Sequence, residues 1–380
     1  MAKKQKTDAY RKLGRIVAVL FVLLLLCGAG YWWMDRTVQL QEEENQLRAE
    51  QENELLLEQY EQAKAEEDQK RREENTVDAQ WPLPASSGWD VIDLTEYPIL
   101  NAYSVTAERK QLLMGGMLLL NRWHAQPADF TTLMESELLG IHDADKSIAV
   151  SGSGEKMFPK AIGALSEMLA AAKEDGLDSF YVDEGYRYMT SQQKYYDNEA
   201  AKHPDKAGDA LIDKVVAAGV SYPGTSEYGS GLSFRIARYR KDDSEFNKAK
   251  FNTTEHSDWL VANSWKYGII CRFTFQDFPN STVTDKSYKT GMNVKANIYR
   301  YVGKGHAAVM HALDMCMEEY VEYLAKHPHI AVYEDGVLRY EITRTVANAD
   351  YGAEIRLSGN AVDYSASIDN MGGVIVCMSY

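Results

Sequence analysis

The chain has 380 residues, a formal net charge of −15 and four cysteines. This length suffices for one large domain or two ordinary ones. The negative charge argues against nucleic acid as a partner, because phosphate binding needs a concentrated basic surface. The cysteines show no C-x-x-C spacing, so they favour neither a disulfide framework nor a cysteine-bound zinc ion.

The first element is an uncharged segment at residues 16–34, IVAVLFVLLLLCGAGYWWM. A helix of this length, at about 1.5 Å per residue, just spans the hydrocarbon core of a bilayer. Residues 1–15 carry six Lys and Arg, and three aromatic residues lie near the far end of the segment. This pattern predicts a transmembrane helix with a basic cytoplasmic N-terminus. A cleaved signal peptide and a lipid anchor at Cys27 are the alternatives.

Residues 35–78 form a second region, rich in Glu, Gln, Lys, Arg and Leu and free of Gly and Pro. A helix of some 40 residues would reach roughly 60 Å from the membrane. Its broken leucine stripe fits a short parallel coiled coil, which would make the chain a homodimer. A solvated single helix held by charge pairs fits as well. Either way, the segment is predicted to be a spacer.

The globular part begins near Trp81 and mixes long helices with alternating strands, which is typical of an α+β fold. Apolar spacing predicts helices at 158–176, 189–203, 207–219, 255–267 and 304–326. Alternation predicts strands at 179–187 and 231–238. Residues 331–380 are strand-rich with an Asp-Gly turn at 335–336, and we expect a C-terminal β extension.

Four segments share an order and spacing with one known family. They are DEGYRYMTSQQKYY at 183–196, PGTSEYGSGLSFRI at 223–236, WLVANSWKYGIICR at 259–272 and GMNVKANIYRYVG at 291–303. Together they resemble the VanY-type D-alanyl-D-alanine carboxypeptidases of the LAS metallopeptidase group. The resemblance covers about residues 115–326, within a predicted domain at 79–330. It implies a small antiparallel sheet flanked by helices, with residues 118–130 as the opening strand.

The resemblance also assigns positions to the family's zinc site, and here they hold other residues. The family's three zinc ligands correspond to Tyr228, Arg235 and Ile298, and its catalytic Glu corresponds to Lys295. A hydrolytic zinc site needs three ligands with lone pairs and an open position for water. Isoleucine has no lone pair, and arginine is a cation. We therefore predict no catalytic residue, no metal ligand and no cofactor, although zinc is expected in the family.

The peptide-binding part of the family pattern is present. The resemblance implies that the Arg of G-Y-R engages a carboxylate and that the Gln five residues later helps to hold the peptide. The predicted ligand-binding residues are Arg187, Gln192, Ser226, Glu227, Tyr228, Arg235 and Lys295. If Arg235 and Lys295 both face the cleft, they need an anionic partner. Glu184 or Glu227 would close the site, whereas a bound carboxylate would make it a receptor.

Three functions follow from these features. The first is a membrane-anchored, catalytically inactive protein of the bacterial cell envelope, with its C-terminal domain extracellular. It would bind the peptidoglycan stem peptide or an envelope protein. The second is an active zinc carboxypeptidase with an atypical site. The third is a structural scaffold whose cleft is filled by its own side chains.

Overall fold

The computed structural model describes residues 81–84, 87–152, 154–292, 294 and 297–380, with eleven helical residues between 22 and 62. The chain divides into two compact units, Met1–Glu74 and Asn75–Tyr380. Within the described residues, no helix is long and apolar enough to cross a membrane. The predicted span at 16–34 and spacer at 35–78 lie almost wholly outside the described residues, so both stay predictions.

The second unit contains a four-stranded antiparallel sheet in the order β5-β6-β8-β7. Its strands are β5 (Phe180–Glu184), β6 (Ser233–Arg238), β8 (Ile298–Tyr301) and β7 (Ile269–Cys271). One face carries the buried side chains of Val182, Phe234, Ile236 and Tyr299. Phe234 is the cross-strand partner of Tyr299, and their rings stack at 6.3 Å. This sheet confirms the predicted α+β core.

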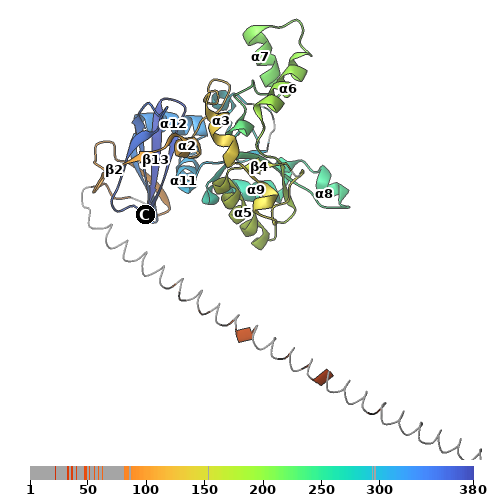
Figure 1. The fold of residues 1–380 in the computed structure, drawn as a ribbon, viewed down its shortest axis with the longest axis horizontal. Coiled ribbons are helices and arrows are strands. Elements are labelled where there is room, and N and C mark those ends of the chain that lie inside the picture. The colour runs from red at the N-terminus through yellow and green to blue at the C-terminus, as the bar shows by residue number, and fades with distance from the viewer. Residues whose placement is uncertain are drawn as a thin grey trace, which may run out of the picture. The chain divides into compact units, whose positions relative to one another are not determined.

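Helices flank this sheet. Helix α5 (Pro159–Glu174) begins with Pro at its first turn, where the missing N–H costs nothing, and its buried stripe joins the main core. It ends before Gly176, whose φ of +85° suits glycine. Helix α9 (Glu255–Asn263) is capped by the Thr254 side chain. Helices α6 (Met189–Ala200) and α7 (Gly208–Ala217) form a pair that projects from the rest of the unit (Figure 1).

A second, five-stranded antiparallel sheet has the order β1-β9-β10-β13-β12. Its strands are β1 (Trp89–Asp93), β9 (His329–Glu334), β10 (Val337–Val346), β13 (Gly373–Ser379) and β12 (Asp363–Ile368), and β2 (Tyr103–Ala107) pairs separately with β11 (Ala353–Leu357). Asp335 and Gly336 both have positive φ, as a tight hairpin turn requires, so the predicted turn is confirmed. Helices α11 (Lys304–Ala312) and α12 (Met317–Lys326) pack against this sheet (Figure 1).

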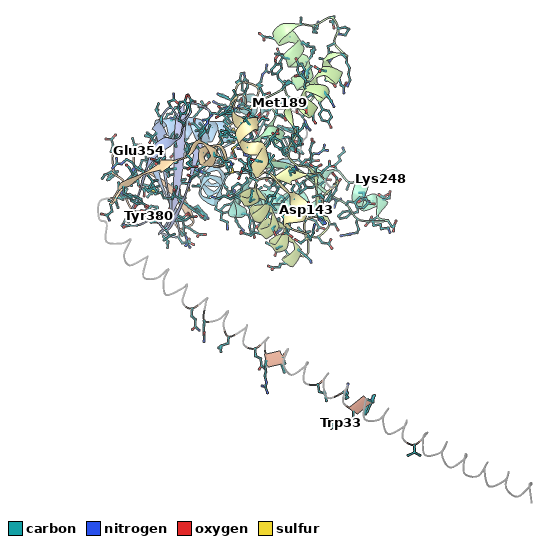
Figure 2. All side chains as sticks on the ribbon, viewed as in Figure 1. Trp33, Asp143, Met189, Lys248, Glu354 and Tyr380 are labelled. Carbon is teal, nitrogen blue, oxygen red and sulfur yellow. The ribbon has the colours of Figure 1, made fainter. Side chains whose placement is uncertain are left out.

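The remaining elements are short. They are α2 (Arg109–Leu113), α3 (Phe130–Met134), η1 (Glu135–Glu137), β3 (Leu139–Gly140), α4 (Ile141–Ala144), β4 (Lys156–Met157), η2 (Glu227–Ser230), α8 (Ser244–Lys248), η3 (Phe251–Thr253), η4 (Ser264–Tyr267) and α10 (Ser287–Thr290). Figure 2 shows that side chains of the second unit fill the space between the two sheets and their helices. The main core draws residues from both sheets, including Phe234 and Val376, so the sheets share one apolar interior.

The structure corrects two predicted elements and leaves the domain boundaries at 79 and 330 as predictions. The helix predicted at 304–326 is two helices, because the chain turns at Asp314, whose φ is +48°. The strand predicted at 118–130 is irregular apart from an isolated bridge between Asn121 and His124, and it ends in α3.

Candidate ligand-binding cleft

A cavity of about 350 Å³ opens beside β5, β6 and β8. Polar groups and apolar side chains both line it. Its lining includes Asp183, Glu184, Arg187, Ser226, Glu227, Tyr228, Arg235, Phe273, Met292, Val294, Asn297 and Ile298. Its volume lies within the range of small-ligand sites. The cavity therefore brings together most of the residues that the sequence predicted to bind a ligand.

Arg187 lies between two tyrosine rings in this cleft. Its guanidinium carbon is 4.3 Å from the ring centroid of Tyr228 and 4.6 Å from that of Tyr195. Its Nε donates to Glu184 at 2.6 Å, and its Nη1 donates to the side-chain oxygen of Gln192 at 2.7 Å. Nη2 donates to no described residue, so one N–H edge of this fixed cation is available to a ligand.

The two residues before Arg187 serve packing. A Cβ added to Gly185 would lie 2.6 Å from the main-chain oxygen of Lys156, so only glycine fits there. Tyr186 is buried, and its hydroxyl donates to Glu135 at 3.0 Å. The G-Y-R motif thus combines two structural residues with one that faces the cleft.

Apolar side chains form one wall of the cleft. Tyr228 and Ile298 pack with Phe273 and Met292 in a small buried cluster. Burial raises the pKa of the Tyr228 hydroxyl, which therefore stays neutral at any physiological pH. That hydroxyl donates to no described residue, although the side chain is only 8% exposed. It is a hydrogen-bond donor available inside the cleft.

Arg235 lies on β6, directly opposite Ile298 of β8. Its guanidinium forms an ion pair with Asp183 of β5. Its Nε is buried and has no hydrogen-bond partner among the described residues. The pair is partly exposed, at 43% for Arg235 and 28% for Asp183, so solvent weakens it. An incoming anion can therefore compete with Asp183 for this cation.

Glu227 lies beneath the cleft in a buried ion network. Its carboxylate accepts hydrogen bonds from Arg272, at 2.9 Å, from Arg300 and from Ser233, at 2.8 Å. Burial alone would raise its pKa, but Arg300 and Arg272 hold that pKa below the usual range. Arg272 also bonds both oxygens of Glu318. Glu227 thus supports the cleft from below, and its direct contact with a ligand stays a prediction.

The two described cations that line the cleft both have carboxylate partners. Arg187 is paired with Glu184, and Arg235 is paired with Asp183. Lys295, the third predicted cation, lies outside the described residues. The ion pair of Asp183 with Arg235 was not predicted from the sequence. The signal for it in the sequence is that Asp183 is adjacent to Glu184 on β5, the strand that pairs with β6. In the described part of the cleft, Glu184 and Asp183 balance these two cations, and Glu227 is neutralised from below by Arg272 and Arg300.

Comparison with known proteins assigns the family. Residues 154–304 match the family described as "VanY: D-alanyl-D-alanine carboxypeptidase". A putative carboxypeptidase of Bacillus subtilis, YodJ, is 31% identical over 211 residues, which cover 55% of this chain and 68% of that protein. The chain belongs to the VanY family. The resemblance carried by the four sequence segments is thereby confirmed.

Solved structures agree on the fold. The chain is similar to the vancomycin resistance D,D-dipeptidase VanXYg, crystallised with a D-Ala-D-Ala phosphinate analogue. The TM-score is 0.54 at 21% identity, and the match covers 73% of this chain and 99% of that one. This likeness supports the LAS-type α+β core.

The comparisons also correct the cofactor prediction. A vancomycin resistance D,D-pentapeptidase VanY, 28% identical to this chain, has been solved in complex with Zn(II). That match covers 54% of this chain and 98% of the other, with a TM-score of 0.40. The prediction of no cofactor is therefore contradicted at the level of the family, since this relative binds zinc.

The residues at the three family ligand positions do not fit a zinc ion as they stand. Ile298 carries no donor atom, Arg235 is a cation bonded to Asp183, and the Tyr228 hydroxyl is held neutral by burial. These positions nevertheless converge, since all three line the same cavity. Across the described ranges, no group of three or more His, Cys, Asp or Glu side chains is placed to hold a metal ion.

Proposed function

We propose that this VanY-family chain binds the C-terminal carboxylate of a peptidoglycan stem peptide and holds the peptide without hydrolysing it. The observation that carries the proposal is the geometry of Arg187. Its position is fixed by Glu184, Gln192 and two tyrosine rings, and one N–H edge is left over. A cation that is already ordered loses little entropy when a carboxylate binds to it.

Neighbouring donors support the same ligand. The Tyr228 hydroxyl has no hydrogen-bond partner in the described part of the chain, and Tyr228 and Arg235 both line the cavity with Arg187. Each hydrogen bond from a charged donor to a carboxylate contributes about 1.5–3 kcal/mol. The apolar wall of Phe273, Met292 and Ile298 offers a surface for the small methyl side chain of alanine.

The chemistry of the cleft supports binding rather than cleavage. Hydrolysis of a peptide bond needs a group that takes a proton from the attacking water. Each carboxylate in the described lining is paired with a guanidinium: Asp183 with Arg235, Glu184 with Arg187, and Glu227 with Arg272 and Arg300. An active carboxypeptidase with an atypical site is the alternative, and a scaffold with a self-filled cleft is the third.

Anchoring at the cell envelope belongs to the same proposal. The uncharged segment 16–34 and the basic residues before it support a single-pass anchor in the bacterial cell membrane, with the VanY-type domain outside. Residues 35–78 would then act as a spacer that carries the domain toward the wall. An envelope protein is the alternative ligand for the cleft.

Calorimetry with a D-Ala-D-Ala-terminated stem peptide tests the proposal. Arg187→Ala should weaken binding about tenfold or more, since it removes at least one charge-assisted hydrogen bond. Arg356→Ala is the matched control, because Arg356 is an exposed arginine on β11 that does not line this cavity. Binding should also weaken with salt, as expected for a partly exposed ionic contact.

Three results would contradict the proposal. Unchanged affinity in Arg187→Ala, or a folded wild type that binds no peptide at millimolar concentration, would favour the self-filled scaffold. Release of D-alanine from the peptide with zinc added would favour the active carboxypeptidase.

A further inference from the structure

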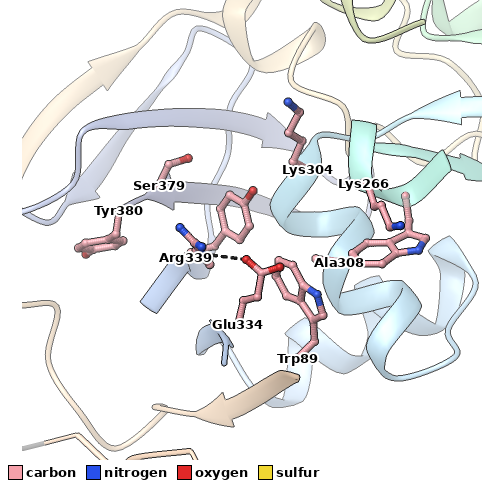
Figure 3. A pocket seen from close by; sticks show the side chains of 10 residues that line it. Trp89, Lys266, Lys304, Ala308, Glu334, Arg339, Ser379 and Tyr380 are labelled. Atoms are coloured by element: carbon pink, nitrogen blue, oxygen red, sulfur yellow. Dashed lines mark hydrogen bonds and ion pairs between the residues drawn. The ribbon is translucent and has the colours of Figure 1, made fainter. Parts of the chain in front are cut away.

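A second cavity, of about 580 Å³, lies where the VanY-type core meets the five-stranded sheet. Its lining comes from β1, η4, α11, β10, the end of β9 and the end of the chain (Figure 3). It shares no lining residue with the cleft around Arg187. Most of the residues that line this second cavity lie outside residues 154–304, the segment that matches the VanY family.

Aromatic rings form much of this cavity. The indoles of Trp89 and Trp265 meet edge to face with ring centroids 5.5 Å apart, and Tyr340 and Tyr380 complete the aromatic lining. Trp265 is fixed from behind, because it stacks on His311 at 4.2 Å. Both indoles are only partly buried, and the Trp89 N–H donates to no described residue. A ligand can therefore contact both a ring surface and a free donor.

Charged groups surround the rings, and cations predominate. Lys266, Lys304 and Arg339 line the cavity together with a single side-chain carboxylate, Glu334. Glu334 accepts a hydrogen bond from Arg339 at 3.0 Å, as Figure 3 shows. Lys304 bridges to Glu167 at 3.0 Å, but both side chains are more than half exposed, so this contact is weak. Three cations against one carboxylate are notable in a chain with a net charge of −15.

We propose that this cavity binds a carboxylate-bearing amino sugar, one unit of a glycan strand. A pyranose ring has an apolar C–H face that packs flat on an indole, while its hydroxyl and acetamido groups point outward from the ring edge. Trp89 supplies the ring surface and the N–H donor, and the surrounding cations supply partners for the carboxylate. The volume lies within the range of small-ligand sites.

An extended peptide fits this cavity less well. Peptides that bind to a sheet pair with the free backbone groups of an edge strand. Of the strands that line the cavity, β9, β10 and β13 are interior strands of their sheet, so their backbone groups are already paired. Of these lining strands, only β1, which contributes Trp89, lies at an edge of the sheet. Most of the recognition here therefore depends on side chains, as it does for a sugar.

The inference extends the proposed function, because a glycan strand carries the stem peptides that the cleft would bind. A stem peptide is joined to its sugar through the carboxyl group of that sugar, so the acidic unit in this cavity is one that carries no stem peptide. Two separate sites on one polymer would raise the affinity for the wall beyond that of either site alone. The two proposals can fail separately, since each has its own ligand and its own residues.

The test is calorimetry of the full-length chain with N-acetylmuramic acid and with N-acetylglucosamine. The two sugars share an acetamido pyranose ring, and only the first carries a carboxylate. We expect saturable binding of N-acetylmuramic acid and at least tenfold weaker binding of N-acetylglucosamine. Trp89→Ala and, separately, Arg339→Gln should each weaken binding of the acidic sugar tenfold or more. Arg339 is partly exposed, so Arg339→Gln keeps the test valid if Trp89→Ala misfolds.

Two controls locate the effect. Lys248→Gln removes an exposed cation on α8, far from Tyr380 (Figure 2), and should leave sugar binding unchanged. Arg187→Ala should weaken binding of the stem peptide but not binding of the sugar. The inference is overturned if the folded wild type binds no acidic sugar at 10 mM (~10,000 times the Kd of a micromolar site), if both sugars bind equally, or if Arg187→Ala weakens binding of the sugar.

Discussion

The buried charged side chains below the cleft each have a partner of opposite charge. Glu227 and Glu318 face Arg272 and Arg300, and all four side chains are almost completely buried. The guanidinium groups also donate to the main-chain oxygens of Gly116, Leu118 and Leu120. A buried pair of this kind is costly to break, because removal of one partner leaves an uncompensated charge. The network therefore fixes the floor on which the Ser226–Tyr228 turn rests.

A buried histidine gives the fold a dependence on pH. His306 is 1% exposed and contacts the Tyr320 hydroxyl at 2.9 Å, and burial lowers its pKa to about 3. In the unfolded chain a histidine has a pKa of about 6.5. Below pH 6.5 the unfolded chain therefore binds a proton that the folded chain does not, and stability falls as pH falls toward 3.

Chemical denaturation at two pH values measures this effect. Between pH 7 and 5.5, the wild type should lose about 1 kcal/mol more of its free energy of unfolding than His306→Gln does. An equal loss in both proteins would show that His306 does not stay neutral in the fold. Lys326→Gln, an exposed change on α12, should follow the wild type.

At the scale of elements, local patterns predicted most helices and strands, and tertiary contacts decided the rest. Helix α5 and strands β5 and β6 lie where the sequence placed them, because their apolar spacing matches the face that they bury. The segment near residues 116–120 is apolar enough for a strand. Its main-chain oxygens instead accept hydrogen bonds from the guanidinium groups of Arg300, on β8, and Arg272, directly after β7. No local pattern reveals such distant partners.

The candidate site was likewise predicted in part from the sequence. The resemblance named Arg187, Gln192 and Tyr228, which the structure brings into contact with one another through Arg187. It did not reveal that Asp183 pairs with Arg235, since that pair depends on the irregular register between β5 and β6. Spacing along the chain gives positions on strands, but ion pairs also depend on side-chain direction.

The pairing of β6 with β8 makes a prediction about metal binding. Arg235 and Ile298 are cross-strand partners, and Tyr228 lines the same cavity. Directly opposed residues of an antiparallel pair lie about 5 Å apart at Cβ, close enough to share one ion. The variant Tyr228→His, Arg235→Asp, Ile298→His therefore places three zinc donors together. It should bind zinc at least tenfold more tightly than the wild type, as measured by competition with a chelator.

A variant with Ile298→Ala in place of Ile298→His is the matched control, since it keeps the other two changes and removes one donor. It should bind zinc more weakly than the triple variant. A folded triple variant with the zinc affinity of the wild type would mean that the three side chains point apart.

At the scale of the whole molecule, the proposal of a membrane anchor predicts that the compact unit Asn75–Tyr380 lies on the outer side of the cell membrane. Basic residues before the segment 16–34 should keep the N-terminus in the cytoplasm. Protease added to intact, wall-stripped cells should then degrade the unit while a cytoplasmic marker survives. Survival of a C-terminal epitope in that experiment would overturn the topology.

The strand β1 ties the start of the compact unit to its end. It pairs with β9 over five residues, from Trp89 opposite Glu334 to Asp93 opposite Ile330. During synthesis, β1 therefore leaves the ribosome long before the strand beside which it finally lies. Pairing across so long a stretch of chain is slow to form. Until the last strands are made, β1 has no partner, so a nascent chain halted before residue 329 should leave this segment open to chaperones and proteases.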